Sequence, residues 1–161
     1  MTPATVTSRV DSPIGPLLLI GRGGALVGVH MHKQRHMPAP DAAWPSDDRA
    51  LAGVADQLRA YFAGDLKEFD VDIVFDGTPF QCRVWGALRD IPYGETVSYG
   101  TLAAAVGRRG AARAVGAAVG RNPVSIIVPC HRVVGADGSL TGFGGGLDRK
   151  QFLLGLESGR R

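Results

Sequence analysis

One short stretch, residues 124–131, constrains this chain more than any other. It begins with Val-Ser-Ile-Ile-Val, a composition typical of a short, fully buried strand. Pro129 cannot donate a backbone hydrogen bond to a sheet, so we expect the strand to end there. The thiol of Cys130 and the imidazole of His131 follow at once. A lone Cys is more often a small buried hydrophobe, but a thiol at the end of a rigid strand is well placed to meet a ligand.

The composition is that of a globular protein with a substantial core. The chain has 161 residues, of which 45% are hydrophobic and 20% charged. Its longest early apolar run, residues 17–20, is too short for a membrane span or a signal sequence, so we expect a cytoplasmic protein. Cys82 and Cys130 do not have CxxC spacing, which favours neither a disulfide framework nor a zinc motif.

The charges are divided unevenly along the chain. Residues 1–79 hold 7 Lys/Arg and 10 Asp/Glu, whereas residues 80–161 hold 11 Lys/Arg and 5 Asp/Glu. Ten of the 11 cations in the second half are Arg. An arginine-rich half is typical of a protein that binds a polyanion such as nucleic acid, although many basic faces are merely solvated.

The first half predicts a small antiparallel sheet with one helix. Three short strands are expected at residues 5–10, 16–21 and 25–30, separated by turn signals. Asp47 or Asp48 is expected to cap a helix that runs to about Phe62 and ends at Gly64. The alternation over residues 69–75 predicts a further strand.

Three histidines, His30, His32 and His36, form a loose cluster in this half. A structural zinc site needs four well-spaced ligands, and no Cys lies nearby. We therefore expect no metal there, and the first half is interpreted as a scaffold.

The second half predicts a mostly helical lobe. Residues 76–79 are the expected boundary between a scaffold lobe, residues 1–77, and a second lobe, residues 78–161. Thr78 is expected to cap a helix that begins at Pro79, and Ser98 to cap a short one. A basic turn and a further helix, residues 111–119, complete a helix-turn-helix pattern over about 98–119. The expected fold class is α+β.

The second helix of that pair carries one long cation among small residues. Ala112, Ala114 and Gly116 give it a smooth face, and Arg113 projects from it. Small residues let helices pack closely, and they would equally let this helix approach a DNA backbone while Arg113 enters a groove or replaces a base in the stack. The residues themselves favour neither interpretation.

A glycine-rich loop, residues 135–146, follows the Cys-containing stretch, with Phe143 as its aromatic residue. It lacks the Lys-Ser/Thr of a phosphate-binding loop, so the mobile wall of a pocket is a better interpretation. Asp148 is expected to cap the last helix, with Phe152, Leu153 and Leu156 on its inner face.

Chemistry at Cys130 requires a nearby base, because the thiolate is the nucleophile. His131 is adjacent, but neighbours in an extended chain face opposite ways. A contact between them therefore needs a turn at residues 129–130 or an intervening water. Glu157, near the end of the last helix, is the natural carboxylate to orient the imidazole, although a lone Glu there is more commonly solvated.

Residues 128–133, Val-Pro-Cys-His-Arg-Val, resemble the PCHRV signature of the O6-alkylguanine-DNA alkyltransferases, or methylated-DNA–protein-cysteine S-methyltransferases. The likeness continues in order and covers essentially all of residues 78–157. It includes Phe80-Gln81, Val84-Trp85, Ile91 to Glu95, Ser98-Tyr99, Ala112 to Gly116, Asn122-Pro123, and the loop 142–146 with Arg149-Lys150. Ser12-Pro13-Ile14-Gly15 is similar to the family's variable first lobe.

This resemblance implies direct-reversal DNA repair without cofactor or metal. An alkyl group would pass irreversibly from O6 of guanine, or O4 of thymine, in duplex DNA to Cys130, after the base flips out on the minor-groove side. His131 would take the thiol proton through a water, and Glu157 would steady the imidazolium. Tyr99 would press on the rotating phosphate and protonate the leaving guanine, and Asn122 would tie the recognition helix to the strand.

The resemblance also assigns contacts to DNA and to the flipped base. The expected DNA contacts are Arg113, Tyr99, Ala112, Ala114, Gly116 and Arg132. The expected pocket residues are Pro129, Val133, Phe143 and Gly144. Phe143 stands where many members have Tyr, and Gly144 offers no side-chain hydroxyl to the guanine oxygen, so recognition of O6 would rest on backbone N–H groups.

Two other functions stay open. A Cys-His-Glu hydrolase would turn over repeatedly, but it leaves the Arg-bearing helix-turn-helix unexplained. A non-catalytic protein that binds alkyl lesions would not need Cys130. We expect a monomer in solution; cooperative binding to DNA and the range of alkyl groups accepted are left open.

Overall fold

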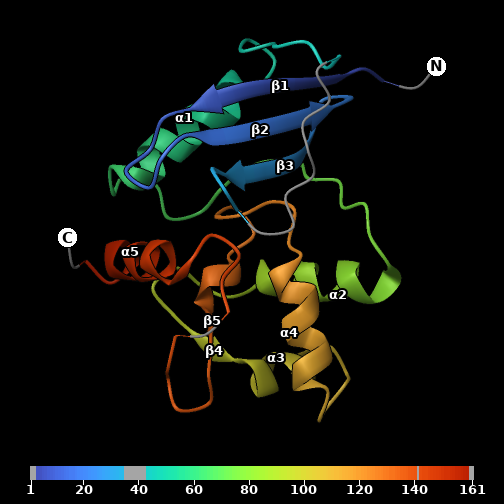
Figure 1. Cartoon of the computed structure of the whole chain (residues 1–161), viewed down its shortest axis with the longest axis vertical. Coiled ribbons are helices and arrows are strands. Elements are labelled where there is room, and N and C mark those ends of the chain that lie inside the picture. The colour runs from blue at the N-terminus through green and yellow to red at the C-terminus, as the bar shows by residue number, and fades with distance from the viewer. Residues whose placement is uncertain (1–2, 35–42, 141, 160–161) are drawn as a thin grey trace.

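The computed structural model describes residues 3–34, 43–140 and 142–159, and it confirms the α+β fold (Figure 1). A three-stranded sheet with one helix, α1, lies at one end of the molecule, and the other helices gather at the opposite end. We refer to described residues up to 77 as the N-terminal lobe and to those from 78 as the C-terminal lobe. Within the described ranges, no helix has the length and apolar character needed to cross a membrane.

The sheet of the N-terminal lobe is antiparallel, in the order β1-β2-β3. Its strands are β1 (Thr5–Val10), β2 (Leu17–Arg22) and β3 (Ala25–Met31), so the three predicted strands are confirmed to within one residue at each end. Leu17 pairs with Met31 and Leu19 with Val29. All four side chains are fully buried, and they form the face of the sheet that packs into the core.

Helix α1 (Ala52–Phe62) begins later than predicted, and neither Asp47 nor Asp48 is its N-cap. Asp47 instead accepts a hydrogen bond from the backbone N–H of Ala50 in the preceding turn, and Asp48 accepts one from Ser8. The two carboxylates are therefore used before the helix starts. Gly64, in the left-handed region at φ 82°, follows the helix end as predicted.

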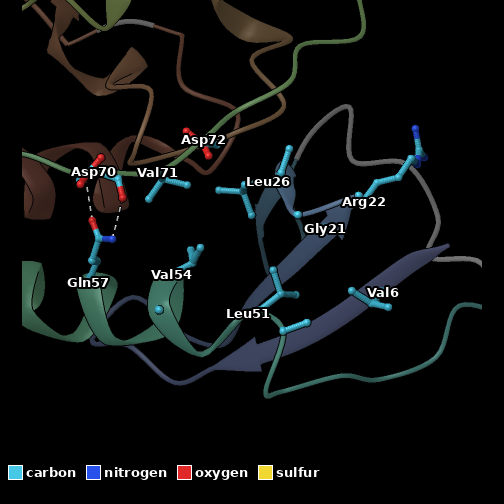
Figure 2. Close-up of a pocket in the computed structure, with 15 residues that line it drawn as sticks. Val6, Gly21, Arg22, Leu26, Leu51, Val54, Gln57, Asp70, Val71 and Asp72 are labelled. Carbon is cyan, nitrogen blue, oxygen red and sulfur yellow. Dashed lines mark hydrogen bonds between the residues drawn. The ribbon is translucent and has the colours of Figure 1, made fainter. Parts of the chain in front are cut away.

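The predicted strand at residues 69–75 is wrong. Only Ile73 forms a bridge, with Leu26, and the residues on either side of it belong to no helix or strand. Gln57 of α1 explains the interruption, because its side-chain amide takes both backbone groups of Asp70: Nε2 donates to the carbonyl at 2.9 Å and Oε1 accepts from the N–H at 2.8 Å (Figure 2). Those groups are therefore not available to a neighbouring strand.

The C-terminal lobe contains the predicted helices and one small sheet that the sequence did not predict. Thr78 and Gln81 form a capping box at the start of α2, and Ser98 caps α3. The Trp85 indole donates to the carbonyl of Ala118 at 2.8 Å, which fastens α2 to α4. The elements are α2 (Pro79–Leu88), β4 (Val97–Ser98), α3 (Tyr99–Ala105), α4 (Ala112–Gly120), β5 (Val133–Val134), parallel to β4, and α5 (Leu147–Glu157).

Two expectations for α5 are wrong. Gly146 is its N-cap, and Asp148 lies in the first turn without capping it. Phe152 is 40% exposed, with its ring 6.5 Å from that of Phe62, whereas Leu153 and Leu156 are buried as predicted. The positive φ of Gly146, 95°, lets the chain turn into the helix without a side-chain cap.

The stretch before Cys130 is buried, but it is a turn and not the predicted strand. Ile126 has φ 74°, and Val124 alone bridges to the sheet, at Val29. The side chain of Asn122 takes the place of a strand partner: its Oδ1 accepts from the N–H of Val124 at 3.0 Å, and its Nδ2 donates to the carbonyl of Val128 at 2.8 Å. β-branched residues favour a strand only where a partner is present.

Candidate active site

Cys130 begins a single turn of 3-10 helix, Cys130–Arg132, and is 7% exposed. Pro129 leads into it with φ −82° and ψ 66°, and the Cys130 N–H donates to the carbonyl of Val128 at 2.8 Å. The turn between Pro129 and Cys130, one of the two ways in which the thiol and the imidazole could meet, is therefore present.

Glu157 is bonded by three side chains, and the predicted contact with His131 is among them. Its Oε2 lies 2.7 Å from His131 Nε2 and accepts from the Tyr61 hydroxyl at 2.6 Å. Arg132 donates from Nε to Oε1 at 2.8 Å and from Nη2 to Oε2 at 3.0 Å. All four residues are buried, so this carboxylate joins α1, α5 and the turn of Cys130.

The electrostatics of this cluster fix the form of the imidazole. Burial on its own would raise the pKa of Glu157, but hydrogen bonds from His131 and Arg132 outweigh it and lower the pKa to about 2. Burial lowers the pKa of His131, so the imidazole is neutral at neutral pH. A neutral ring that donates from Nε2 to a carboxylate keeps a lone pair on Nδ1. That nitrogen is buried and has no hydrogen-bond partner within the described part of the chain.

The thiol is protonated at rest. Burial raises the pKa of Cys130, and the Asn122 side chain and the charge of Lys150 partly oppose this by lowering it. Chemistry at the sulfur therefore needs a base to take its proton, and Nδ1 of His131 is chemically suited to do so.

Lys150 was missed from the sequence as a site residue. It is fully buried on the inner face of α5, and its Nζ donates to the carbonyl of Val133 at 2.5 Å. The signal was its spacing, since positions 150, 153 and 157 lie on one face of a helix. A lysine on the same face as these buried positions indicates a buried cation next to the part of the protein that the helix packs against.

A cavity of about 10 Å³ adjoins Cys130, which is room for roughly one water molecule. Phe143 and Gly144, two of the residues expected to form the pocket for the base, line it. Met31 and Gln34 of the N-terminal lobe also line it, and the sequence gave no sign of either. The other lining residues are Val119, Gly120, Asn122, Ser125, Gly142 and Gly145.

The remaining predicted pocket and DNA residues lie elsewhere. Arg132 does not fit a DNA contact, because it is buried and its guanidinium bonds Glu157 and the carbonyl of Ile91, the latter at 2.6 Å. Pro129 lines a separate cavity with Arg132. Val133 is fully buried in β5, where its carbonyl accepts from Lys150.

Helix α3 lies at the end of the C-terminal lobe that is farther from the three-stranded sheet, and α4 packs against it and runs back toward the sheet (Figure 1). Arg113 and Ala114 are exposed on α4, and Ala112 and Gly116 are half-buried. A Cβ on Gly116 would lie 3.6 Å from the Tyr99 ring, and one on Gly142 would lie 3.8 Å from the Tyr99 hydroxyl. Tyr99 therefore stands between α4 and the glycine-rich loop.

The described residues contain no group of three or more His, Cys, Asp or Glu side chains arranged to hold a metal ion. His36 of the histidine cluster lies outside the described residues. A cavity of about 220 Å³ in the N-terminal lobe, between α1 and the β2–β3 hairpin, is lined by no Cys or His (Figure 2).

Both halves of the chain match known protein families. Residues 6–75 match a family described as "6-O-methylguanine DNA methyltransferase, ribonuclease-like domain", and residues 79–159 match its "DNA binding domain". A methylated-DNA–protein-cysteine methyltransferase of Mycobacterium tuberculosis is 57% identical over 151 residues, which cover 94% of this chain and 91% of that protein. One from Methanosarcina acetivorans is 51% identical over 148 residues, covering 91% and 94%.

A solved structure is similar throughout. The crystal structure of Mycobacterium tuberculosis OGT in complex with DNA superposes with a TM-score of 0.89 at 55% sequence identity, covering 98% of this chain and 94% of that one.

Glu157→Gln tests the buried carboxylate. We expect it to lower the free energy of unfolding at pH 7 by about 3–5 kcal/mol, because it leaves Arg132 buried without its counter-charge. In the wild type, the folded pKa of about 2 lies below the unfolded 4.5, so the stabilisation is present above pH 4.5 and is lost as the pH falls toward 2.

Urea unfolding between pH 3 and 7 measures both effects. Below pH 4.5, titration of Glu157 lowers the free energy of unfolding of the wild type by up to about 1.4 kcal/mol per pH unit, and the variant should lack this decrease. Glu68→Gln, which neutralises an exposed carboxylate, is the matched control. Equal losses in the two variants would contradict the role of Glu157.

Lys150→Met tests the buried cation. Removing the charge removes one of the influences that lower the pKa of Cys130, so the thiol should react with iodoacetamide only at higher pH than in the wild type. The rate of carbamidomethylation is followed by mass spectrometry against pH, in a Cys82→Ser background. Lys150→Arg keeps the charge and should keep the wild-type profile; a Met variant with that same profile would argue against the role.

Proposed function

The chain belongs to the 6-O-methylguanine DNA methyltransferase family, so it is a DNA-binding repair enzyme that transfers an alkyl group to a cysteine of its own, and we propose that the acceptor is Cys130. We propose further that the donor is O6 of guanine, or O4 of thymine, in duplex DNA. The observation that supports this is the buried Cys130, followed in the same turn by His131, whose neutral imidazole Glu157 holds by its Nε2.

The reaction we propose begins with the thiol proton. Nδ1 of His131 takes it through one water. The imidazolium so formed lies against the Glu157 carboxylate, which stabilises its charge. Of the residues near Cys130, His131 has the free lone pair that a base requires.

The sulfur then attacks the alkyl carbon in line with O6. The S–C bond forms as the C–O6 bond breaks, and its electron pair passes to the guanine ring. The Tyr99 hydroxyl gives the ring a proton and regains one from the site, so that the thiol proton ends formally on guanine. The products are an S-alkyl cysteine and guanine.

Each molecule would react once. An alkyl thioether does not hydrolyse in water, because a thiolate is a poor leaving group from a saturated carbon. The protein would therefore be a stoichiometric reagent, and its capacity for repair would equal the number of molecules present.

Access to the sulfur would require base flipping. A cavity of about 10 Å³ is far smaller than a purine, so an incoming base must displace its walls. We propose that α4 enters the minor groove, with its small residues against the sugar-phosphate backbone and the exposed Arg113 in the space that the base leaves. The position of Tyr99, between α4 and the glycine-rich loop, supports its contact with the rotated phosphate.

Intact-protein mass after mixing with duplex DNA that holds one O6-methylguanine tests this function. We expect a gain of about 14 Da, the replacement of a thiol hydrogen by methyl, on the wild type and none on Cys130→Ser. No gain with binding intact would favour a lesion-binding protein. Repeated turnover without a mass gain would favour a hydrolase.

Arg113→Ala tests the role of α4. The variant should react with duplex O6-methylguanine roughly 10- to 100-fold more slowly, since flipping costs a few kcal/mol, and react normally with free O6-benzylguanine base. Arg121→Ala, which removes another exposed arginine at the end of α4, is the matched control. Equal slowing in both variants would indicate only a general loss of positive charge.

A further inference from the structure

The cavity beside Cys130 is built from both lobes. Met31, the last residue of β3, and Gln34, in the turn after it, line this cavity together with residues of the C-terminal lobe. Nothing in the alkyl-transfer chemistry uses these two side chains. Their position next to the sulfur raises the question of what they determine.

The turn that holds Gln34 is fixed by hydrogen bonds. Gln34 Oε1 accepts from the Met31 N–H at 2.9 Å and from the Ser125 hydroxyl at 3.3 Å. The Gln34 N–H donates to the Met31 carbonyl at 3.2 Å, and Lys33 between them has φ 59°. One amide side chain therefore ties the end of β3 to the segment that leads to Cys130.

Met31 closes the cavity against the glycine-rich loop. It is fully buried, and a Cβ on Gly145 would lie 2.6 Å from its Cε and 2.7 Å from its Sδ. The same Cβ would lie 2.9 Å from Phe143 Cε2. The end of the Met31 side chain thus packs directly against the backbone of the loop.

We propose that Met31, braced by Gln34, determines how large an alkyl group Cys130 accepts. This inference rests on the proposed alkyl transfer. Much of the cavity is walled by backbone or small residues, which have no long side chain that could change rotamer, whereas Met31 is a long, unbranched side chain whose three torsions can change. A methyl group requires little displacement of it, and a benzyl group requires much more.

Met31→Ala tests the proposal, with rates of Cys130 alkylation measured for duplexes that hold O6-methylguanine or O6-benzylguanine. We expect the ratio of the benzyl rate to the methyl rate to rise by about tenfold or more, the range in which a hydrophobic pocket discriminates by size. Met31→Leu, of similar volume, should keep the wild-type ratio.

Leu58→Ala is the matched control, because Leu58 is equally buried in α1 and does not line the cavity. It should lower the melting temperature and leave the ratio unchanged. An unchanged ratio in folded Met31→Ala, or an equal rise in Leu58→Ala, would overturn the proposal.

Gln34→Ala decides the matter if Met31→Ala does not fold. Loss of the acceptor for the Met31 N–H should loosen the wall and raise the ratio, and an unchanged ratio would overturn the proposal. A wild-type protein that O6-methylguanine leaves unmodified would instead refute the proposed function, so the two failures are distinguishable.

Discussion

The buried carboxylate of Glu157 is the constraint on which the site depends. A buried charge is costly unless it is paired and hydrogen-bonded, and this one accepts from Tyr61, His131 and Arg132. The partners come from two places: Tyr61 from the N-terminal lobe, and His131 and Arg132 from the turn of Cys130. The same bonds that stabilise the charge therefore set the position of the turn and the tautomer of the imidazole, so structure and reactivity are not separable here.

Asn122 imposes the second constraint, on the backbone that leads to the thiol. Its amide bonds the Val124 N–H and the Val128 carbonyl, which a neighbouring strand would otherwise satisfy. The chain can then turn tightly at Ile126 while it stays buried. The same side chain lowers the pKa of Cys130. Asn122 thus satisfies two backbone hydrogen-bonding groups and partly offsets the rise in the pKa of the thiol.

Much of this could be predicted from local sequence. The three strands, the cap at Thr78 and the helix-turn-helix follow from periodicity and capping residues, and Glu157 follows from what a thiol-imidazole pair needs. The strand at 124–128 was wrong, because propensity reports how residues fit a sheet and not whether a partner strand exists. Arg132, Lys150 and Met31 could not be assigned, since the sites of a buried cation and of a cross-lobe contact are set by tertiary packing.

The Cys130 thiol is protonated at rest because burial raises its pKa more than its neighbours lower it. A permanently low thiol pKa would make Cys130 a ready nucleophile toward any electrophile, and an S-alkylated molecule of a single-use protein is lost. Burial instead raises the pKa, and Asn122 and Lys150 partly oppose that rise. The cavity beside the sulfur has room for only about one water, so a larger reagent must displace its walls. We infer that the thiol reacts fastest when the alkylated nucleobase displaces the cavity walls, so burial provides selectivity at the expense of intrinsic reactivity.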